Sequence, residues 1–108
     1  MEAPGGHLLV VEDDPEMRDL LRKVLEKSGY QVAAAGSGPE ALALLPLQSF
    51  DLVVTDMHMP LEGGLSLLEA IPTASPGTPV IIVTAFGDRD SRLRATQLGA
   101  AAFISKPL

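Results

Sequence analysis

The chain has 108 residues, 46% of them hydrophobic and 20% charged, which is typical of one folded domain with a single core. Cysteine is absent and no apolar run can span a bilayer, which excludes a disulfide scaffold, a thiolate metal site and a membrane helix. The net charge of −6 argues against nucleic-acid binding, which depends on basic side chains that neutralise phosphates. Because no secretion signal is visible at the start, we expect a cytoplasmic protein that does not associate with membranes.

Short apolar runs that are typical of strands alternate along the chain with longer segments of helical periodicity. Strands are predicted at 7–11, 30–35, 52–55, 79–83 and 100–104, and helices at 15–28, 38–45, 65–71 and 89–98. This order predicts an α/β fold with a parallel sheet that is covered by helices on both faces.

The helix boundaries follow from residues that favour helix ends. Asp14 is a preferred N-cap, and Pro15 suits the first helical position. Residues 37–40, with the sequence Ser-Gly-Pro-Glu, form a plausible capping box for the second helix. Gly29 is expected to end the first helix, and Pro72 is expected to close the third.

In an open parallel sheet, ligands bind beyond the carboxyl ends of the strands. Glu12 and Asp13 follow the first strand, Asp56 follows the third, Thr84 follows the fourth and Lys106 follows the fifth. The strand at 30–35 ends at Gly36, which offers no side chain. Three carboxylates, a hydroxyl and an ammonium group are therefore expected at one edge.

This set of groups suits phosphoryl chemistry. Clustered carboxylates bind a divalent cation, and Mg²⁺ is the usual ion where phosphate is involved. Asp56 can act as a nucleophile toward a phosphoryl group, while Lys106 and the Thr84 hydroxyl can stabilise its oxygens. Each residue alone also has an ordinary explanation as a cap, a strand end or a surface lysine. Their joint occurrence at strand ends favours the functional interpretation.

Four segments, in this order and spacing, resemble the receiver domain of two-component response regulators. They are residues 9–14 (LVVEDD), 56–60 (DMHMP) with Gly64 and Leu67 beyond, 83–85 (VTA) and 103–107 (FISKP). The resemblance extends from Leu8 to Pro107. It implies a flavodoxin-like, doubly wound sheet of five parallel strands in the order 2-1-3-4-5.

The resemblance also implies residue roles. Asp56 corresponds to the phosphorylated aspartate and is also one of the metal-binding residues. Asp13 corresponds to the direct Mg²⁺ ligand, with Glu12 reaching the metal through water. The backbone carbonyl of His58 corresponds to a further metal ligand, and the His58 imidazole is expected to face solvent. Such a domain catalyses only its own phosphorylation and dephosphorylation, so we do not expect an enzyme that turns over a separate substrate.

The remaining implied roles concern the conformational switch and the partners. Thr84 and Lys106 match the phosphoryl-binding pair, and Phe103 matches the aromatic switch residue. The implied phosphodonor is a histidine kinase or a histidine phosphotransfer protein, and homodimer formation is a further expectation. The donor would dock over the first helix, where Arg18 and Arg22 are interspersed with acidic residues.

One feature departs from the family pattern. Receiver domains continue after the Lys-Pro turn into a fifth helix, whereas this sequence stops at Leu108. We therefore expect residues 1–108 to form a receiver domain truncated before its last helix, with any output domain outside this chain. The absent helix is expected to leave apolar surface of strands one, three and five uncovered.

Three other classes remain as alternatives. A phosphatase of the haloacid dehalogenase type also forms an aspartyl-phosphate, but it needs an acid two residues after the nucleophile, where this chain has His58. A flavin-binding module would cradle phosphate in its first loop, where residues 12–14 would repel it. A degenerate receiver used only for docking would not need Asp56, Thr84 and Lys106.

Overall fold

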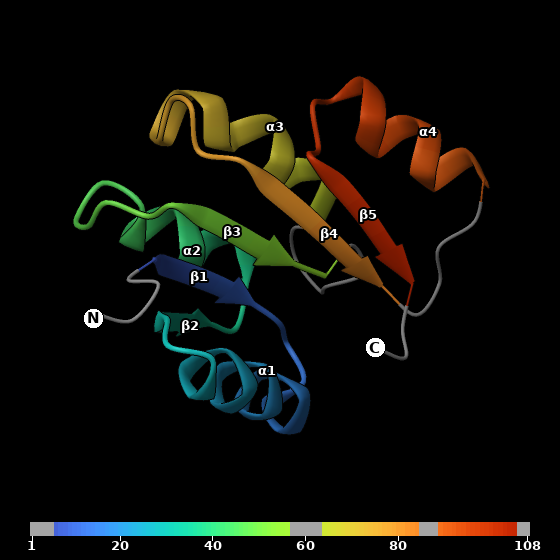
Figure 1. Ribbon diagram of the computed structural model, residues 1–108. Helices are drawn as coiled ribbons and strands as arrows, with labels where there is room; N and C mark the ends of the chain where they lie inside the picture. The colour runs from blue at the N-terminus through green and yellow to red at the C-terminus, as the bar shows by residue number, and fades with distance from the viewer. Residues whose placement is uncertain (1–5, 57–63, 85–88, 106–108) are drawn as a thin grey trace.

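The computed structural model describes residues 6–56, 64–84 and 89–105 of the chain. Strands and helices alternate through these residues as predicted (Figure 1). The elements are β1 (His7–Val11), α1 (Pro15–Lys27), β2 (Gln31–Ala35), α2 (Gly38–Leu44), β3 (Leu52–Thr55), α3 (Gly64–Ala74), β4 (Val80–Thr84), α4 (Arg89–Gln97) and β5 (Ala102–Ser105).

The strands form one parallel sheet in the order β2-β1-β3-β4-β5, which confirms the predicted fold class and strand order. The register aligns the last residues of β1, β2 and β3 at one edge of the sheet. Val11 of β1 lies opposite both Ala35 of β2 and Thr55 of β3. The residues that follow Val11 and Thr55 are thereby placed side by side at the carboxyl edge.

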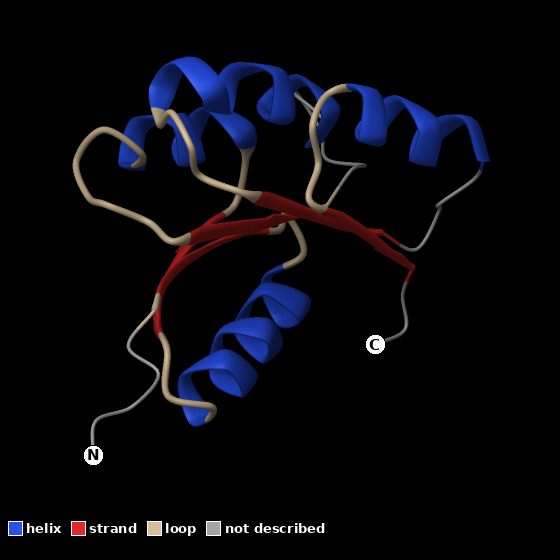
Figure 2. Cartoon of the chain, turned by 45° about the horizontal axis from the view of Figure 1, so that its top comes forward, coloured by secondary structure: helices blue, strands red, loops and turns tan. Residues whose placement is uncertain are grey.

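Helices cover both faces of the sheet. Figure 2 shows α1 on one face and α2, α3 and α4 on the other. The main core lies under α2 and α3, where Leu9, Val53 and Ile82 of the three central strands are completely buried. Among the described helices, none is both long enough and apolar enough to cross a membrane.

The predicted N-caps are present. The Asp14 carboxylate accepts a hydrogen bond from the Glu16 amide at 3.0 Å, and the Ser37 hydroxyl accepts one from the Glu40 amide at 3.2 Å. The Glu40 carboxylate does not return to Ser37, as a standard capping box requires, but accepts a hydrogen bond of 2.6 Å from the Gly36 amide. The second half of this box is therefore shifted by one residue, toward the end of β2.

β2, β4 and β5 begin one or two residues later than predicted, and β2 and β5 do so for the same reason. After Gly29, which has a φ of 102°, the Tyr30 amide donates to the Leu25 carbonyl of the preceding helix. The Ala100 amide donates to Ala95 in the same way at the end of α4. These bonds satisfy the last helical carbonyls, so Tyr30 and Ala100 belong to helix-ending turns and the strands start beyond them.

The prediction that Pro72 closes the third helix is wrong. Helix α3 continues through Pro72 to Ala74. Pro72 has no amide proton to donate, so α3 loses one hydrogen bond there and continues for only two further residues. Burial of the preceding Ile71 and a 2.7 Å hydrogen bond from the Ser75 amide to its carbonyl maintain the final turn.

The sheet face that carries α1 is covered unevenly. Val10 of β1 is completely buried beside α1, so the expectation of an uncovered first strand is wrong. Farther along the same face, Val54 of β3 is half-buried and Ile104 of β5 is 39% exposed. On α1, Leu20 and Val24 are also exposed. The exposed apolar surface therefore lies over β3, β5 and the flank of α1.

Candidate functional site

The ends of β1 and β3 position the first two acidic residues. The Asp56 amide donates to the Val11 carbonyl at 3.1 Å, which continues the β1–β3 ladder one residue beyond Thr55. On the other side of β1, the Glu12 amide donates to the Ala35 carbonyl at 3.0 Å. Both acids thus leave the sheet from backbone that is still hydrogen-bonded to a neighbouring strand.

Three of the predicted acidic residues meet at this edge. Glu12, Asp13 and Asp56 each place one carboxylate oxygen within 4.8 Å of those of the other two. Glu12 is 2% and Asp56 9% exposed, and Asp13 is the most accessible of the three. Three negative charges at this spacing repel one another, and a divalent cation with oxygen ligands would offset that repulsion.

Hydrogen bonds between neighbouring residues stabilise the turn at residues 12–14, which follows β1. The Asp14 amide donates to the Glu12 carboxylate at 3.3 Å, and the buried Thr55 hydroxyl donates to the Asp56 carbonyl at 3.1 Å. The carboxylate of Asp14 caps α1. Asp14 is therefore a structural residue, as its sequence position predicts, although it adjoins Asp13 in the chain.

Other predicted site residues are only partly described. Thr84 ends β4 and pairs with Ser105 of β5, which places its backbone at the same edge of the sheet. The Thr84 side chain, His58 and Lys106 lie outside the described residues. Phe103 is described: its ring is half-buried against the core, and the Cζ atom of Arg92 lies 5.2 Å from its centroid.

Arg18 and Gly36 are two neighbours of the site that sequence reasoning missed. The Arg18 guanidinium donates from Nη1 to the main-chain carbonyl of Glu12 at 3.1 Å. The sequence suggested Arg18 only as part of a docking surface and gave Gly36 no role. A usable signal was the position of Arg18 four residues after the Asp14 cap, where a long side chain can reach back to the strand end.

The outer charges of α1 pair within the helix. Asp19 contacts Arg22 at 2.6 Å and Lys23 at 3.0 Å, and Arg22 also contacts Glu26 at 3.1 Å. Hydrogen bonds from Lys23 and then Arg22 lower the pKa of Asp19, and the bond to Asp19 raises that of Arg22. These groups are exposed, so the pairs add little stability and lie outside the acidic cluster.

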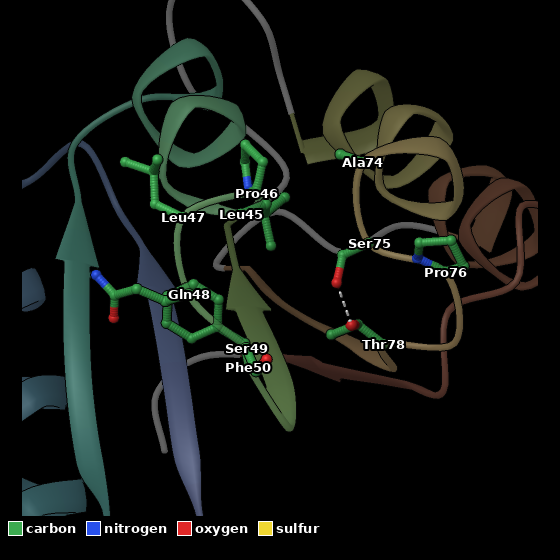
Figure 3. Close-up of a pocket in the computed structure, with 10 residues that line it drawn as sticks. All are labelled: Leu45, Pro46, Leu47, Gln48, Ser49, Phe50, Ala74, Ser75, Pro76 and Thr78. Atoms are coloured by element: carbon green, nitrogen blue, oxygen red, sulfur yellow. Dashed lines mark hydrogen bonds between the residues drawn. The ribbon is translucent and has the colours of Figure 1, made fainter.

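A hollow of about 460 Å³ lies at the opposite edge of the sheet, between the loop after α2 and the loop after α3 (Figure 3). Ser75 and Thr78 share a 2.6 Å hydrogen bond at its side. Its lining contains no carboxylate, histidine, lysine or arginine side chain. This hollow therefore offers no acidic or basic side chain and none of the carboxylate or imidazole ligands that are typical of metal sites.

The chain is similar in sequence to known proteins. The family model for the response regulator receiver domain matches residues 8–108. The chain is 42% identical over its full length to the transcriptional regulatory protein GlrR of Escherichia coli, covering 24% of that protein. It is 38% identical over 93% of its length to the response regulator protein PilR of Pseudomonas aeruginosa, covering 22% of it. The chain thus spans about a quarter of the length of these two relatives.

The fold is similar to solved structures. The non-phosphorylated HemR receiver domain from Leptospira biflexa matches with a TM-score of 0.88 and 38% identity, over 95% of this chain and 83% of that one. A response regulator protein from Burkholderia pseudomallei matches with a TM-score of 0.90 and 27% identity, over 95% of this chain and 61% of that one. The latter structure contains a phosphorylated aspartic acid and a calcium ion.

Proposed function

Because the chain belongs to the response regulator receiver family, we propose that it is a phosphoacceptor whose Asp56 takes a phosphoryl group in the presence of Mg²⁺. The observation that carries this proposal is the cluster of three carboxylate oxygens within 4.8 Å at the ends of β1 and β3. The donor is a phosphohistidine on a histidine kinase or a histidine phosphotransfer protein in the cytoplasm.

The transfer exchanges one bond to phosphorus for another. An Asp56 carboxylate oxygen attacks the phosphorus atom, a P–O bond forms, and the P–N bond to the donor imidazole breaks. The imidazole leaves and takes up a proton. Asp56 is suited to this role because its backbone is fixed to β1 and its side chain is shielded from most of the solvent.

The acidic residues would hold the cation that this reaction needs. Asp13 would bind it directly and Glu12 would bind it through water, while Asp56 and the His58 carbonyl would complete the protein ligands. When bound, Mg²⁺ supplies positive charge that offsets repulsion between the Asp56 carboxylate and the incoming phosphoryl oxygens. Three carboxylate oxygens within 4.8 Å of one another would suit a small ion that is ligated by oxygen, keeps several waters and is reached by one of the carboxylates through water.

Thr84, Phe103 and Lys106 would couple phosphorylation to a change of conformation. Lys106 and the Thr84 hydroxyl would contact the phosphoryl oxygens, and Phe103 would move into the space that Thr84 vacates. Phe103 is already half-buried and in contact with Arg92, so its movement would break a cation–π contact. The phosphoryl group can shift this equilibrium only through contacts that it gains in one state.

The test of the proposal is intact-mass analysis after incubation with acetyl phosphate. The wild-type chain should gain one phosphate adduct with Mg²⁺ and none with EDTA. Asp56→Asn should gain none, whereas Asp51→Asn, at the opposite edge of the sheet, should behave as wild type. An undiminished adduct in the Asp56 variant would refute the assignment. Repeated hydrolysis of a phosphomonoester would show an enzyme of the phosphatase class instead.

A further inference from the structure

The turn that carries the acidic cluster is held by a contact from α1. The main-chain amide of Glu12 is bound to β2 through Ala35, and its carbonyl accepts the 3.1 Å hydrogen bond from Arg18. That carbonyl belongs to the rigid peptide unit that joins Glu12 to Asp13. Rotation of this peptide would move the Cα atom of Asp13 and hence its carboxylate, so the Arg18 contact bears directly on the geometry of the cluster.

Gly36 provides the space through which Arg18 reaches this carbonyl. A Cβ atom at Gly36 would lie 2.9 Å from Nη1 of Arg18 and 3.4 Å from Oε1 of Glu40. The backbone of Gly36 is not in the left-handed region that would itself require glycine. The missing side chain therefore matters because it leaves room for the guanidinium, and the Glu40 carboxylate, bound to the Gly36 amide, borders the same space.

We propose that Arg18 is a positioning residue that holds the Glu12–Asp13 peptide in the orientation needed for cation binding, with Gly36 keeping its path open. This inference rests on the proposed metal-dependent function. Mg²⁺ requires near-octahedral geometry, whereas three mutually repelling carboxylates tend to spread apart. A hydrogen bond to the intervening peptide restrains that spreading before the cation arrives.

The Arg18 guanidinium has two opposite effects on the affinity of the site for a cation. Its positive charge repels a cation, so removing the charge alone would tighten metal binding. Its hydrogen bond fixes the turn, so removing the bond alone would weaken metal binding. Gly36→Ala separates the two effects because it retains every charge. The new methyl group displaces only the far end of a flexible side chain, so the fold should be little affected.

The experiment measures Mg²⁺ affinity by titration and the ¹H–¹⁵N resonance of the Asp13 amide in the metal-free chain. Gly36→Ala should raise the dissociation constant about tenfold, the lower end of the range for residues that support metal ligands. It should also shift the Asp13 amide resonance. In an Arg18→Met background, Gly36→Ala should add no further change, because both substitutions remove the same contact. Arg22→Met, on the outer face of α1, is the matched control and should change neither quantity.

Arg18→Lys gives an independent test that leaves the backbone at position 36 unchanged. It keeps the charge but replaces the planar guanidinium by an ammonium group on a shorter side chain, so the dissociation constant of this variant should lie between those of wild type and Gly36→Ala. A wild-type chain that binds Mg²⁺, together with a Gly36→Ala affinity within twofold of wild type, would overturn the role of Arg18. A wild-type chain that binds no Mg²⁺ would instead overturn the proposed function, and the metal role of Arg18 with it.

Discussion

Charge repulsion within the acidic cluster should make the metal-free protein less stable than a variant with one carboxylate removed. Asp13→Asn is the cleanest such change because Asp13 is the most accessible member of the cluster. Two unit charges at the observed limit of 4.8 Å repel by about 0.9 kcal/mol at a dielectric constant of about 80, and by about 3.5 kcal/mol at about 20. Asp13 has two such neighbours and is itself accessible to solvent, so the high-dielectric value applies to both pairs, and its neutralisation should raise the free energy of unfolding by about 2 kcal/mol.

The assay is thermal and urea unfolding at low salt, with EDTA and then with Mg²⁺. In EDTA, each kcal/mol gained by Asp13→Asn should raise the melting temperature by roughly 4–8 °C for a domain of this size. With Mg²⁺ at tenfold its dissociation constant, the wild type should gain about 1.4 kcal/mol and the variant much less. The stability difference between the two proteins should therefore shrink when the metal is added.

Asp14→Asn is the matched control for this prediction. Asparagine caps a helix as well as aspartate does, so the hydrogen bond to the Glu16 amide can be kept. The lost charge lies in the same turn but outside the cluster, and its favourable interaction with the helix N-terminus is lost too. Asp14→Asn should thus be no more stable than wild type. The reasoning fails if Asp13→Asn is not stabilised in EDTA, or if both variants gain equally.

Two further predictions concern the rest of the fold. Leu9→Ala should lower the free energy of unfolding by about 2–5 kcal/mol in urea denaturation, because Leu9 is completely buried at the centre of the sheet; a loss below 1 kcal/mol would contradict the described core. Hydrogen bonds to Lys23 and Arg22 lower the pKa of Asp19, so their small stabilisation should be present above about pH 4 and lost as the pH falls further. The stability of Asp19→Asn should change less than that of wild type between pH 5 and pH 2, and identical slopes would contradict this assignment.

Much of the site could be predicted because it depends on strand ends. Glu12 and Asp56 each follow a short apolar run, and parallel pairing places the ends of such runs at one edge whatever the details of packing. Asp13 lies close to them because it directly follows Glu12 in the chain. The separate assignment of Asp14 as a cap was also predictable, because it directly precedes Pro15 at a helix start.

The features that the sequence did not reveal depend on tertiary contacts. The position of Arg18 after the Asp14 cap indicates that its side chain can reach the end of β1. Whether it does so depends on where α1 crosses that strand and on the free space at Gly36. The burial of Val10 depends on α1 covering the first strand. The late start of β2 depends on whether the Tyr30 amide bonds back to the helix or across to β1, a competition that propensities do not resolve.

The carboxyl edge of the sheet is also the place where this fold best tolerates clustered acids. In a parallel sheet with helical crossovers, each helix begins near this edge, so the partial positive charges of helix N-termini gather there. Here α1 starts at Pro15, two residues after Asp13, and its first turns also bring the Arg18 guanidinium to the Glu12 carbonyl. Three carboxylate oxygens nevertheless lie within 4.8 Å of one another, a spacing at which like charges repel. The remaining repulsion is the part that a bound cation can relieve, which links the stability of the domain to occupancy of its site.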